Sequence, residues 1–220
     1  MMAYKAAIFD MDGTILNTLQ DLQNATNYAL REHNFPERTY EEVRNFVGNG
    51  VQKLIERALP EGSSDETVQS VLASFKTYYK VHSTDTTAPY EGIPEAIKKL
   101  REAGIKTAVV SNKPDFGVQD LVKDFFPNLF DAALGEKAGI AKKPAPDMVN
   151  SALDSLAVSK ADSVYIGDSD VDFMTAKNSG LSFIGCSWGF KGRSFLEKLG
   201  AGTIVDNAEQ LVQEILKQEK

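Results

Sequence analysis

The sequence predicts an α/β protein with a doubly wound, Rossmann-like parallel sheet that carries an inserted all-helical segment. From residue 89 onward, short continuous apolar runs alternate with helical patterns, which is typical of strands buried on both faces of a parallel sheet. A similar apolar run, Ala6–Phe9, lies near the start of the chain. Between these regions, residues 15 to 83 show helical periodicity alone.

The first predicted strand, Ala6–Phe9, is followed by four predicted helices, and no strand is expected between residues 15 and 83. Pro36 ends the first helix, Thr39 caps the second, and the Gly48-Asn49-Gly50 stretch separates the second from the third. The expected helices are 15–34, 39–47, 51–59 and 65–81. We therefore predict a sheet domain made of residues 1–14 and 84–220, with residues 15–83 inserted as a helical domain and hinges near Asn17 and 87–92.

The second part of the chain supplies the remaining strands and the helices that cover them. Strands are expected at 106–110, 131–134, 163–166, 181–186 and 203–205. Helices are expected at 94–103, 114–125, 145–156, 170–179, 194–199 and 208–217. This alternation of strands and helices along the chain predicts one sheet with helices on both faces.

Composition and charge exclude several classes of function. The 220 residues carry a formal net charge of −7, which argues against nucleic acid as a partner because phosphate backbones attract basic surfaces. No apolar run approaches the ~20 residues that cross a bilayer, so no membrane partner is expected. The single cysteine, Cys186, excludes an intramolecular disulfide and fits the cytoplasm. A monomer and a homodimer are both compatible with these features.

Polar residues follow several predicted strands at the point where each strand ends. Because ligands bind outside the carboxyl ends of strands in such sheets, these residues are expected to converge. The converging groups are Asp10 and Asp12, Ser111-Asn112-Lys113, Lys142-Lys143, and Gly167-Asp168-Ser169-Asp170 with Asp172. Singly, each has a simpler explanation: a helix cap for Asp168, a turn for Ser111-Asn112, a solvated charge for Lys143. Because all of them are expected at the same edge of the sheet, together they indicate a ligand-binding or catalytic site.

The residue types at this edge suit phosphoryl transfer. Carboxylates are the ligands that Mg²⁺ prefers, and a lysine with a hydroxyl suits a phosphoryl group. Both histidines, His33 and His82, lie in the helical segment, so a carboxylate is expected to be the nucleophile. A carboxylate about 4 Å from a phosphate is repelled by roughly 4 kcal/mol per charge pair at an effective dielectric of ~20, which a metal ion and a lysine would offset.

Four stretches resemble the motifs of the haloacid dehalogenase (HAD) superfamily of phosphohydrolases, in the same order. They are Asp10-Met11-Asp12-Gly13-Thr14, Val110-Ser111-Asn112-Lys113, Lys143-Pro144-Ala145-Pro146-Asp147 and Gly167-Asp168-Ser169-Asp170-Val171-Asp172. The resemblance implies that 1–14 and 84–220 form a HAD-like catalytic core and that 15–83 form its helical cap. It also implies a Mg²⁺-dependent phosphatase that works through an aspartyl phosphate.

The resemblance assigns a role to each site residue. Asp10 would be the nucleophile, Asp12 the acid and base, and Lys143 the neutralising cation. Phosphate would be bound by Gly13, Thr14, Ser111 and Asn112. Mg²⁺ would be bound by Asp10, Asp12, Asp168 and Asp172. One departure is Asn17, where related proteins often carry Asp, and we expect it to affect hinge motion rather than chemistry.

A finer resemblance is to phosphoglycolate phosphatases, and it makes 2-phosphoglycolate the expected substrate. It rests on Val43–Gly50 with Glu56–Leu59, on Pro89–Ile93, and on Ser111-Asn112-Lys113. Candidate specificity residues in the cap are Gly48, Asn49, Gly50, Arg44 and Lys53, with Arg57 beside them. Three alternatives stay open: a β-phosphoglucomutase-like sugar-phosphate mutase, a pyrophosphatase of the same superfamily, and a phosphate-binding regulatory protein without turnover.

Overall fold

The computed structural model describes residues 4–217, which form two compact units. The first unit comprises the residues up to 15 together with those from 89 onward, and the second comprises residues 16–88. The predicted helical segment was 15–83. Residues 84–88 therefore group with the helices rather than with the sheet.

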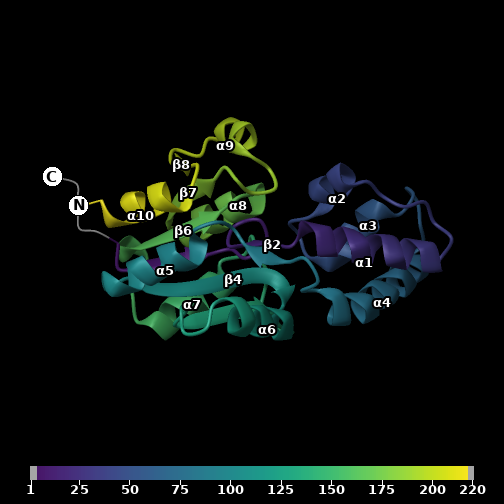
Figure 1. Cartoon of the computed structure of the whole chain (residues 1–220), viewed down its shortest axis with the longest axis horizontal. Coiled ribbons are helices and arrows are strands. Elements are labelled where there is room, and N and C mark those ends of the chain that lie inside the picture. Colours follow the sequence, from purple (N-terminus) through teal and green to yellow (C-terminus); the bar gives the residue numbers. More distant parts are fainter. Residues whose placement is uncertain (1–3, 218–220) are drawn as a thin grey trace. The chain divides into compact units, whose positions relative to one another are not determined.

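The first unit is built on a six-stranded parallel sheet, which confirms the predicted fold class (Figure 1). The strand order is β5-β4-β1-β6-β7-β8. The strands are β1 (Ala6–Phe9), β4 (Lys106–Pro114), β5 (Ala132–Glu136), β6 (Ser163–Gly167), β7 (Ser182–Cys186) and β8 (Ile204–Val205).

Strand β1 lies at the centre of the sheet because all four of its residues are apolar and can be buried on both faces. It pairs with β4 on one side and β6 on the other, so that Ile8 lies opposite Ala108 and Tyr165. Each residue of β1 is fully buried. The first carboxylate after this strand, Asp10, is therefore delivered to the middle of the sheet edge.

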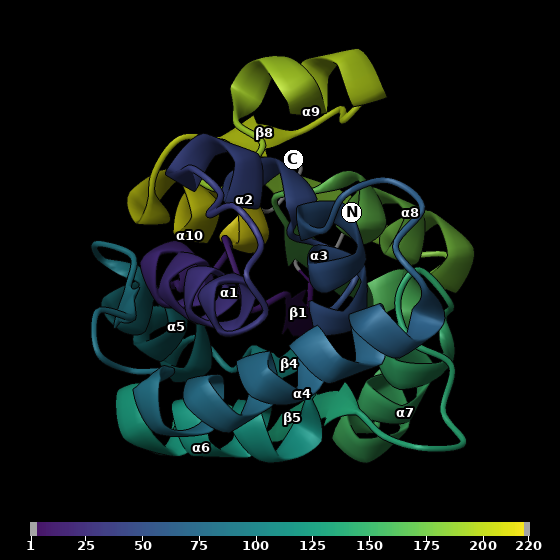
Figure 2. The same cartoon turned by 90° about the vertical axis from the view of Figure 1, so that its right-hand side faces the viewer.

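Helices cover both faces of the sheet. Figure 2 shows α7 and α8 on one side of the strands and α5 and α10 on the other. The helices of this unit are α5 (Ile93–Glu102), α6 (Asp115–Phe125), α7 (Asp147–Leu156), α8 (Asp170–Ser179), α9 (Arg193–Leu199) and α10 (Ala208–Leu216), with a short 3-10 turn at Lys160–Asp162.

The hydrophobic core under α7 follows the strand periodicity. Alternate strand residues point to one face, and those facing α7 and α8 are Ala6, Ile8, Ala108, Val110 and Tyr165. They pack against buried α7 residues such as Met148, Ala152 and Leu153. Tyr165 is the polar exception in this cluster, and its hydroxyl reaches the site described below.

The second unit contains four helices, α1 (Leu19–Glu32), α2 (Tyr40–Phe46), α3 (Val51–Ala58) and α4 (Asp65–His82). Helices α1 and α4 lie side by side, and Tyr28 of α1 stacks on Tyr78 of α4 with ring centroids 4.3 Å apart (Figure 1). Thr39 caps α2 reciprocally with Glu42, as its N-cap position predicts. No helix within residues 4–217 combines the length and apolarity that a bilayer crossing requires.

The two largest differences from the predicted element boundaries are at the start of the first helix and at the end of β4. The first helix does not begin at Ile15, because Leu16–Asn17 forms a short strand, β2, that pairs with β3 (Ala88–Pro89). The Asn17 side chain accepts from the N–H of Leu19, and such local hydrogen bonds compete with helix formation. Strand β4 continues past Val110 to Pro114, with an irregularity in its pairing with β5.

Candidate active site

The turn after β1 places the first pair of carboxylates. The N–H of Asp10 donates to the Ile166 carbonyl at 2.9 Å, so Asp10 still follows the sheet ladder. Gly13 then adopts φ of +90°, which glycine tolerates best. A Cβ at Gly13 would lie 2.6 Å from an oxygen of Asp168, so the missing side chain also makes room for that carboxylate.

Lys143 is the cation at the centre of the site. Its Nζ lies 2.6 Å from Asp10 Oδ1, 2.8 Å from Asp172 Oδ1 and 3.1 Å from the Tyr165 hydroxyl. The Asn112 side-chain amide donates to the Lys143 carbonyl at 3.0 Å, which holds the backbone of this segment. The neighbouring carboxylates outweigh burial and raise the pKa of Lys143 well above its ordinary value, so its charge is kept.

Asp168 and Asp172 come from the end of β6 and the first turn of α8. Ser169 and Asp172 form a reciprocal cap at the start of α8. Asp172 Oδ2 accepts from the Ser169 hydroxyl at 2.6 Å and from the Asp168 N–H at 3.3 Å. The prediction left open whether Asp168 and Asp172 form a helix cap or belong to a site. Asp172 forms the cap with Ser169, and both carboxylates lie near that of Asp10.

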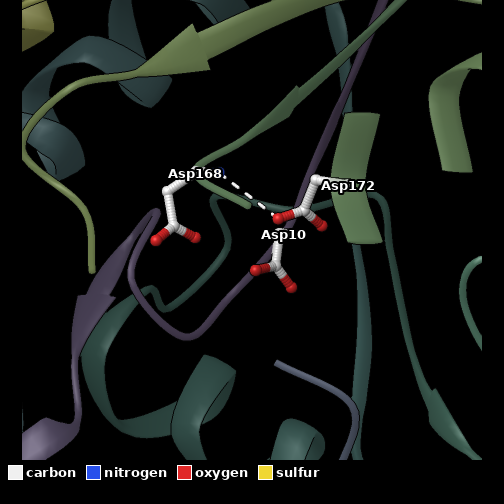
Figure 3. A group of neighbouring side chains, drawn as sticks. All are labelled: Asp10, Asp168 and Asp172. Carbon is white, nitrogen blue, oxygen red and sulfur yellow. Dashed lines mark hydrogen bonds between the residues drawn. The ribbon is translucent and has the colours of Figure 1, made fainter. Parts of the chain in front are cut away.

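The carboxylates of Asp10, Asp168 and Asp172 lie together (Figure 3). One oxygen from each lies within 4.8 Å of the other two, and all three residues are buried. Burial and the adjacent Asp172 raise the pKa of Asp10 well above its ordinary value, and the same two causes raise the pKa of Asp168 to about 7. When all three are ionised, the carboxylates exceed the charge of the one ammonium, and hard oxygen donors of this kind fit Mg²⁺.

Asp12 is half-buried and pairs with a different lysine from Asp10. Lys113 Nζ lies 3.3 Å from Asp12 Oδ1, and the Lys113 side chain is only 4% exposed. Lys113 is carried by the extension of β4 beyond Val110. Each of the two carboxylates of the Asp10-Met11-Asp12 stretch is thus paired with a separate buried lysine.

Polar groups that could hold a phosphoryl group line the same edge. Ser111 and Asn112 are buried on β4, and Ser111 Oγ accepts from the Lys113 N–H at 3.2 Å. Asn112 Oδ1 is buried and has no hydrogen-bond partner among the described residues. The Thr14 hydroxyl lies 3.4 Å from Asp168 Oδ1. Serine, threonine and asparagine groups of this kind suit phosphate oxygens.

The loop after β7 approaches the site from the opposite side to β4. The Phe190 N–H donates to Asp168 Oδ2 at 2.7 Å, and the Trp188 indole N–H donates to the Thr14 carbonyl at 3.0 Å. Gly189 lies against both Asp168 and Gly13. Trp188 therefore makes a hydrogen bond to the turn after β1.

The structure brings Asp10, Lys143, Asp168 and Asp172 together and places Asp12, Gly13, Thr14, Ser111 and Asn112 at the adjoining strand ends, while their chemical roles stay predictions. Of the other polar residues expected at this edge, Lys142 pairs with Glu136 and Asp170 is exposed. The predicted specificity residues belong to the helical unit. There Arg44 pairs with Glu41, Lys53 pairs with Glu56, and Arg57 donates to Asn49 Oδ1 at 2.7 Å. Gly48 and Gly50 have positive φ on either side of Asn49.

Three residues at the site were not predicted from the sequence: Tyr165, Gly189 and Phe190. Lys113 was expected at this edge but had no role, and the structure pairs it with Asp12. Tyr165 stood in an apolar run and looked like core. Gly189 and Phe190 act through close approach and a main-chain N–H, which the sequence does not display.

The sequence and the fold of this chain are similar to those of known proteins. Residues 7–186 match the haloacid dehalogenase-like hydrolase family. Proteins named phosphoglycolate phosphatase from Psychrobacter arcticus and Vibrio vulnificus are 31% and 30% identical and cover 96% of this chain, with 95% and 96% of their own lengths matched. A crystal structure from Lactobacillus delbrueckii subsp. bulgaricus, provisionally assigned as a phosphoglycolate phosphatase, matches with a TM-score of 0.96 and 45% identity over 99% of this chain and 100% of that chain.

Proposed function

The chain belongs to the haloacid dehalogenase-like hydrolase family, and from this premise we propose that it is a Mg²⁺-dependent phosphatase for a small anionic phosphomonoester, 2-phosphoglycolate first. The single observation that carries the proposal is the position of Lys143, whose Nζ lies within 2.8 Å of both Asp10 and Asp172. This ammonium counteracts part of the rise in the pKa of Asp10 that burial causes, and it holds the Asp10 carboxylate in place as a nucleophile.

In the proposed reaction Asp10 attacks phosphorus with a carboxylate oxygen, and the bond from phosphorus to the ester oxygen breaks. Asp12 gives its proton to the departing alkoxide. The product is a phosphoryl group on Asp10. Asp12, now ionised, takes a proton from water as the water attacks phosphorus, and the bond to Asp10 breaks. Free phosphate leaves, Asp10 is regenerated, and Asp12 is again protonated.

The remaining residues position these groups. Lys143 would neutralise both the nucleophile and the phosphoryl oxygens, while Asp172 and the Tyr165 hydroxyl hold Lys143. Lys113 would fix the Asp12 carboxylate. Ser111, Asn112, Gly13 and Thr14 would surround the phosphoryl group.

The donor set fits Mg²⁺, which would be held by Asp10, Asp168 and the Asp12 backbone carbonyl. When bound, the ion supplies positive charge that offsets repulsion between phosphate and carboxylates. Asp172 would support the site by orienting Lys143, since its Oδ1 accepts from Lys143 and from the Tyr165 hydroxyl.

Phosphoglycolate as the substrate is supported by the names of the full-length relatives. Selection would belong to the helical unit, where Arg57 orders the Gly48-Asn49-Gly50 loop from within α3 through its bonds to Asn49 and the Phe46 carbonyl. Arg44 and Lys53 are candidates to meet a substrate carboxylate.

The test is phosphate release from a panel of phosphate esters, with Mg²⁺ and with EDTA. Ethyl phosphate is the matched control for 2-phosphoglycolate, because it lacks only the carboxylate oxygens. Sugar phosphates and pyrophosphate cover the other reactions that the superfamily resemblance suggests. Mg²⁺-dependent release that favours 2-phosphoglycolate is expected. No release from any compound by folded protein with Mg²⁺ would overturn the proposal.

The covalent step has its own test. An acid-quenched single turnover of the wild type should leave a phosphoryl group on the peptide that contains Asp10, detected by mass spectrometry. Asp10→Asn should lose both the label and the turnover, because an amide is a poor nucleophile. Full turnover by Asp10→Asn would contradict an aspartyl phosphate.

A further inference from the structure

We propose that the Trp188–Phe190 segment is a positioning element that joins the turn after β1 to Asp168 and thereby sets the affinity of the site for Mg²⁺. The inference rests on the proposed function in one respect, the identity of the cation. The segment belongs to the loop after β7 and is far in sequence from both parts of the site that it contacts. Three consecutive residues make three different contacts.

The first contact is the main-chain N–H of Phe190, which donates to Asp168 Oδ2 at 2.7 Å. Asp168 is 2% exposed, so water cannot easily replace this donor. The Thr14 hydroxyl lies near the other oxygen, Oδ1, at 3.4 Å. A carboxylate with a donor at each oxygen keeps one orientation, and the geometry of a Mg²⁺ site depends on such orientation.

The second contact is the approach of the Gly189 backbone. A Cβ there would lie 2.2 Å from Asp168 Cβ and 2.5 Å from the Gly13 carbonyl oxygen. Gly189 is not among the described residues with positive φ, so its conformation is open to other residue types. The requirement for glycine is therefore spatial: any side chain would push the loop, Asp168 or the Gly13 turn out of place.

The third contact fixes the turn itself. The Trp188 indole N–H donates to the Thr14 carbonyl at 3.0 Å, and its ring lies beside Tyr90 with centroids 6.5 Å apart. Thr14 follows directly after the Asp12-Gly13 pair. Trp188 and Phe190 thus hold the turn after β1 and Asp168 from one short segment, with Gly189 allowing the approach.

A loop that served only to pack the sheet edge would not need this arrangement. Packing would be satisfied by the buried Phe190 side chain and by the Trp188 ring alone. The donors aimed at a carboxylate and at a turn carbonyl connect the two sources of proposed Mg²⁺ ligands. Loss of these contacts should therefore affect cation binding more than folding.

The experiment measures Mg²⁺ binding to the metal-free wild type, Gly189→Ala and Gly202→Ala by calorimetry, with thermal unfolding in EDTA as the folding control. Gly202 is the matched control because its added Cβ meets no atom within 4 Å and its φ is not positive. We expect Gly189→Ala to weaken Mg²⁺ binding at least about tenfold and Gly202→Ala to leave it unchanged. Wild-type affinity in folded Gly189→Ala would overturn the proposal.

If Gly189→Ala does not fold, a second variant tests the proposed role of the segment in Mg²⁺ binding. Trp188→Phe keeps an aromatic ring but removes the indole N–H, and a lost hydrogen bond of this kind corresponds to about a two- to tenfold weaker affinity. Unchanged Mg²⁺ affinity in Trp188→Phe would then overturn the proposal. Because binding is measured without substrate, failure of phosphatase activity in the wild type would count against the proposed function alone.

Discussion

At the residue scale, Lys143 supplies the positive charge that two buried carboxylates share. It is the ammonium between two buried carboxylates, and its side chain is 3% exposed. A buried ion pair gives limited net stability, but removal of one partner leaves an uncompensated charge. The contribution of Lys143 to folding is therefore conditional on Asp10 and Asp172.

We predict that Lys143→Met lowers the free energy of unfolding by about 3–5 kcal/mol in EDTA, because two buried carboxylates lose their cation. Adding Asp10→Asn to this variant should restore part of the loss. Urea unfolding of the two single variants and the double variant measures the coupling. Additive effects of the two substitutions would contradict the arrangement described for Lys143.

The raised pKa of Asp168 predicts a pH dependence of the metal-free protein. Between about pH 4 and 7 the folded protein keeps a proton on Asp168 that the unfolded chain, with its ordinary pKa of 3.8, has released. Stability from this group is present at low pH and is lost as pH rises through about 7, by up to about 4 kcal/mol.

Urea unfolding from pH 4.5 to 8 in EDTA tests this dependence. The wild type should lose more stability over that range than Asp168→Asn, whose amide does not titrate. Mg²⁺ should reduce the loss, since it favours the ionised carboxylate. Parallel curves for the two proteins in EDTA would rule out the raised pKa.

At the residue scale, the sequence was most informative where several strand ends carry polar groups. Asp10, Lys143 and Asp168 could be predicted together because parallel strands deliver their carboxyl ends to one edge. The pairing of Asp12 with Lys113 could not, since it depends on how far β4 extends. The Phe190 N–H could not be predicted either, because a main-chain donor is common to nearly every residue type.

At the scale of elements, one carboxylate binds the segment at which the chain leaves the helical unit. Asp21, in the first turn of α1, is 1% exposed and accepts from the N–H and the hydroxyl of both Thr86 and Thr87. This bond set lies next to the β2–β3 pair, where the chain enters and leaves the unit. It explains why residues 84–88 group with the helices.

We predict that Asp21→Ala lowers the stability of the helical unit by about 2–3 kcal/mol, because two backbone N–H groups lose their acceptor. Amide hydrogen exchange at Thr86 and Thr87 should accelerate strongly. Asp65→Ala is the matched control, since Asp65 is exposed in the first turn of α4. Unchanged exchange at Thr86 and Thr87 in Asp21→Ala would contradict the role of this acid.

Elements with strong periodicity could be predicted closely, whereas those that depend on pairing could not. The helix predicted over 65–81 is observed as Asp65–His82, with Ser64 as its cap. The two-residue strands β2 and β3 carry no periodicity of their own and exist because two distant segments meet. A local sequence pattern cannot predict pairing between segments that are far apart in the chain.

At the scale of the whole molecule, the chain divides into two compact units. The core under α7 consists of residues from the sheet unit alone. The Tyr90 N–H donates to the Ile15 carbonyl at 3.2 Å, so the two ends of the sheet unit that flank the insertion already lie together.

We therefore predict that the sheet unit folds without residues 16–88 when Ile15 is joined to Pro89 by a short Gly-Ser link. Circular dichroism and urea unfolding should show a cooperative transition. If the helical unit selects the substrate, the shortened protein should also lose preference between 2-phosphoglycolate and ethyl phosphate. A non-cooperative transition would contradict the independence of the sheet unit.

The central place of β1 has a consequence for the order of events on the ribosome. Strand β1 is synthesised before both of its neighbours in the sheet, and β6 follows only after the helical unit, β4 and β5 have been made. Meanwhile the helical residues emerge as a continuous block. Asp10 is therefore made long before Lys143 and Asp168, so a chain that stops between them lacks the cation and the second carboxylate that lie beside Asp10 in the folded protein.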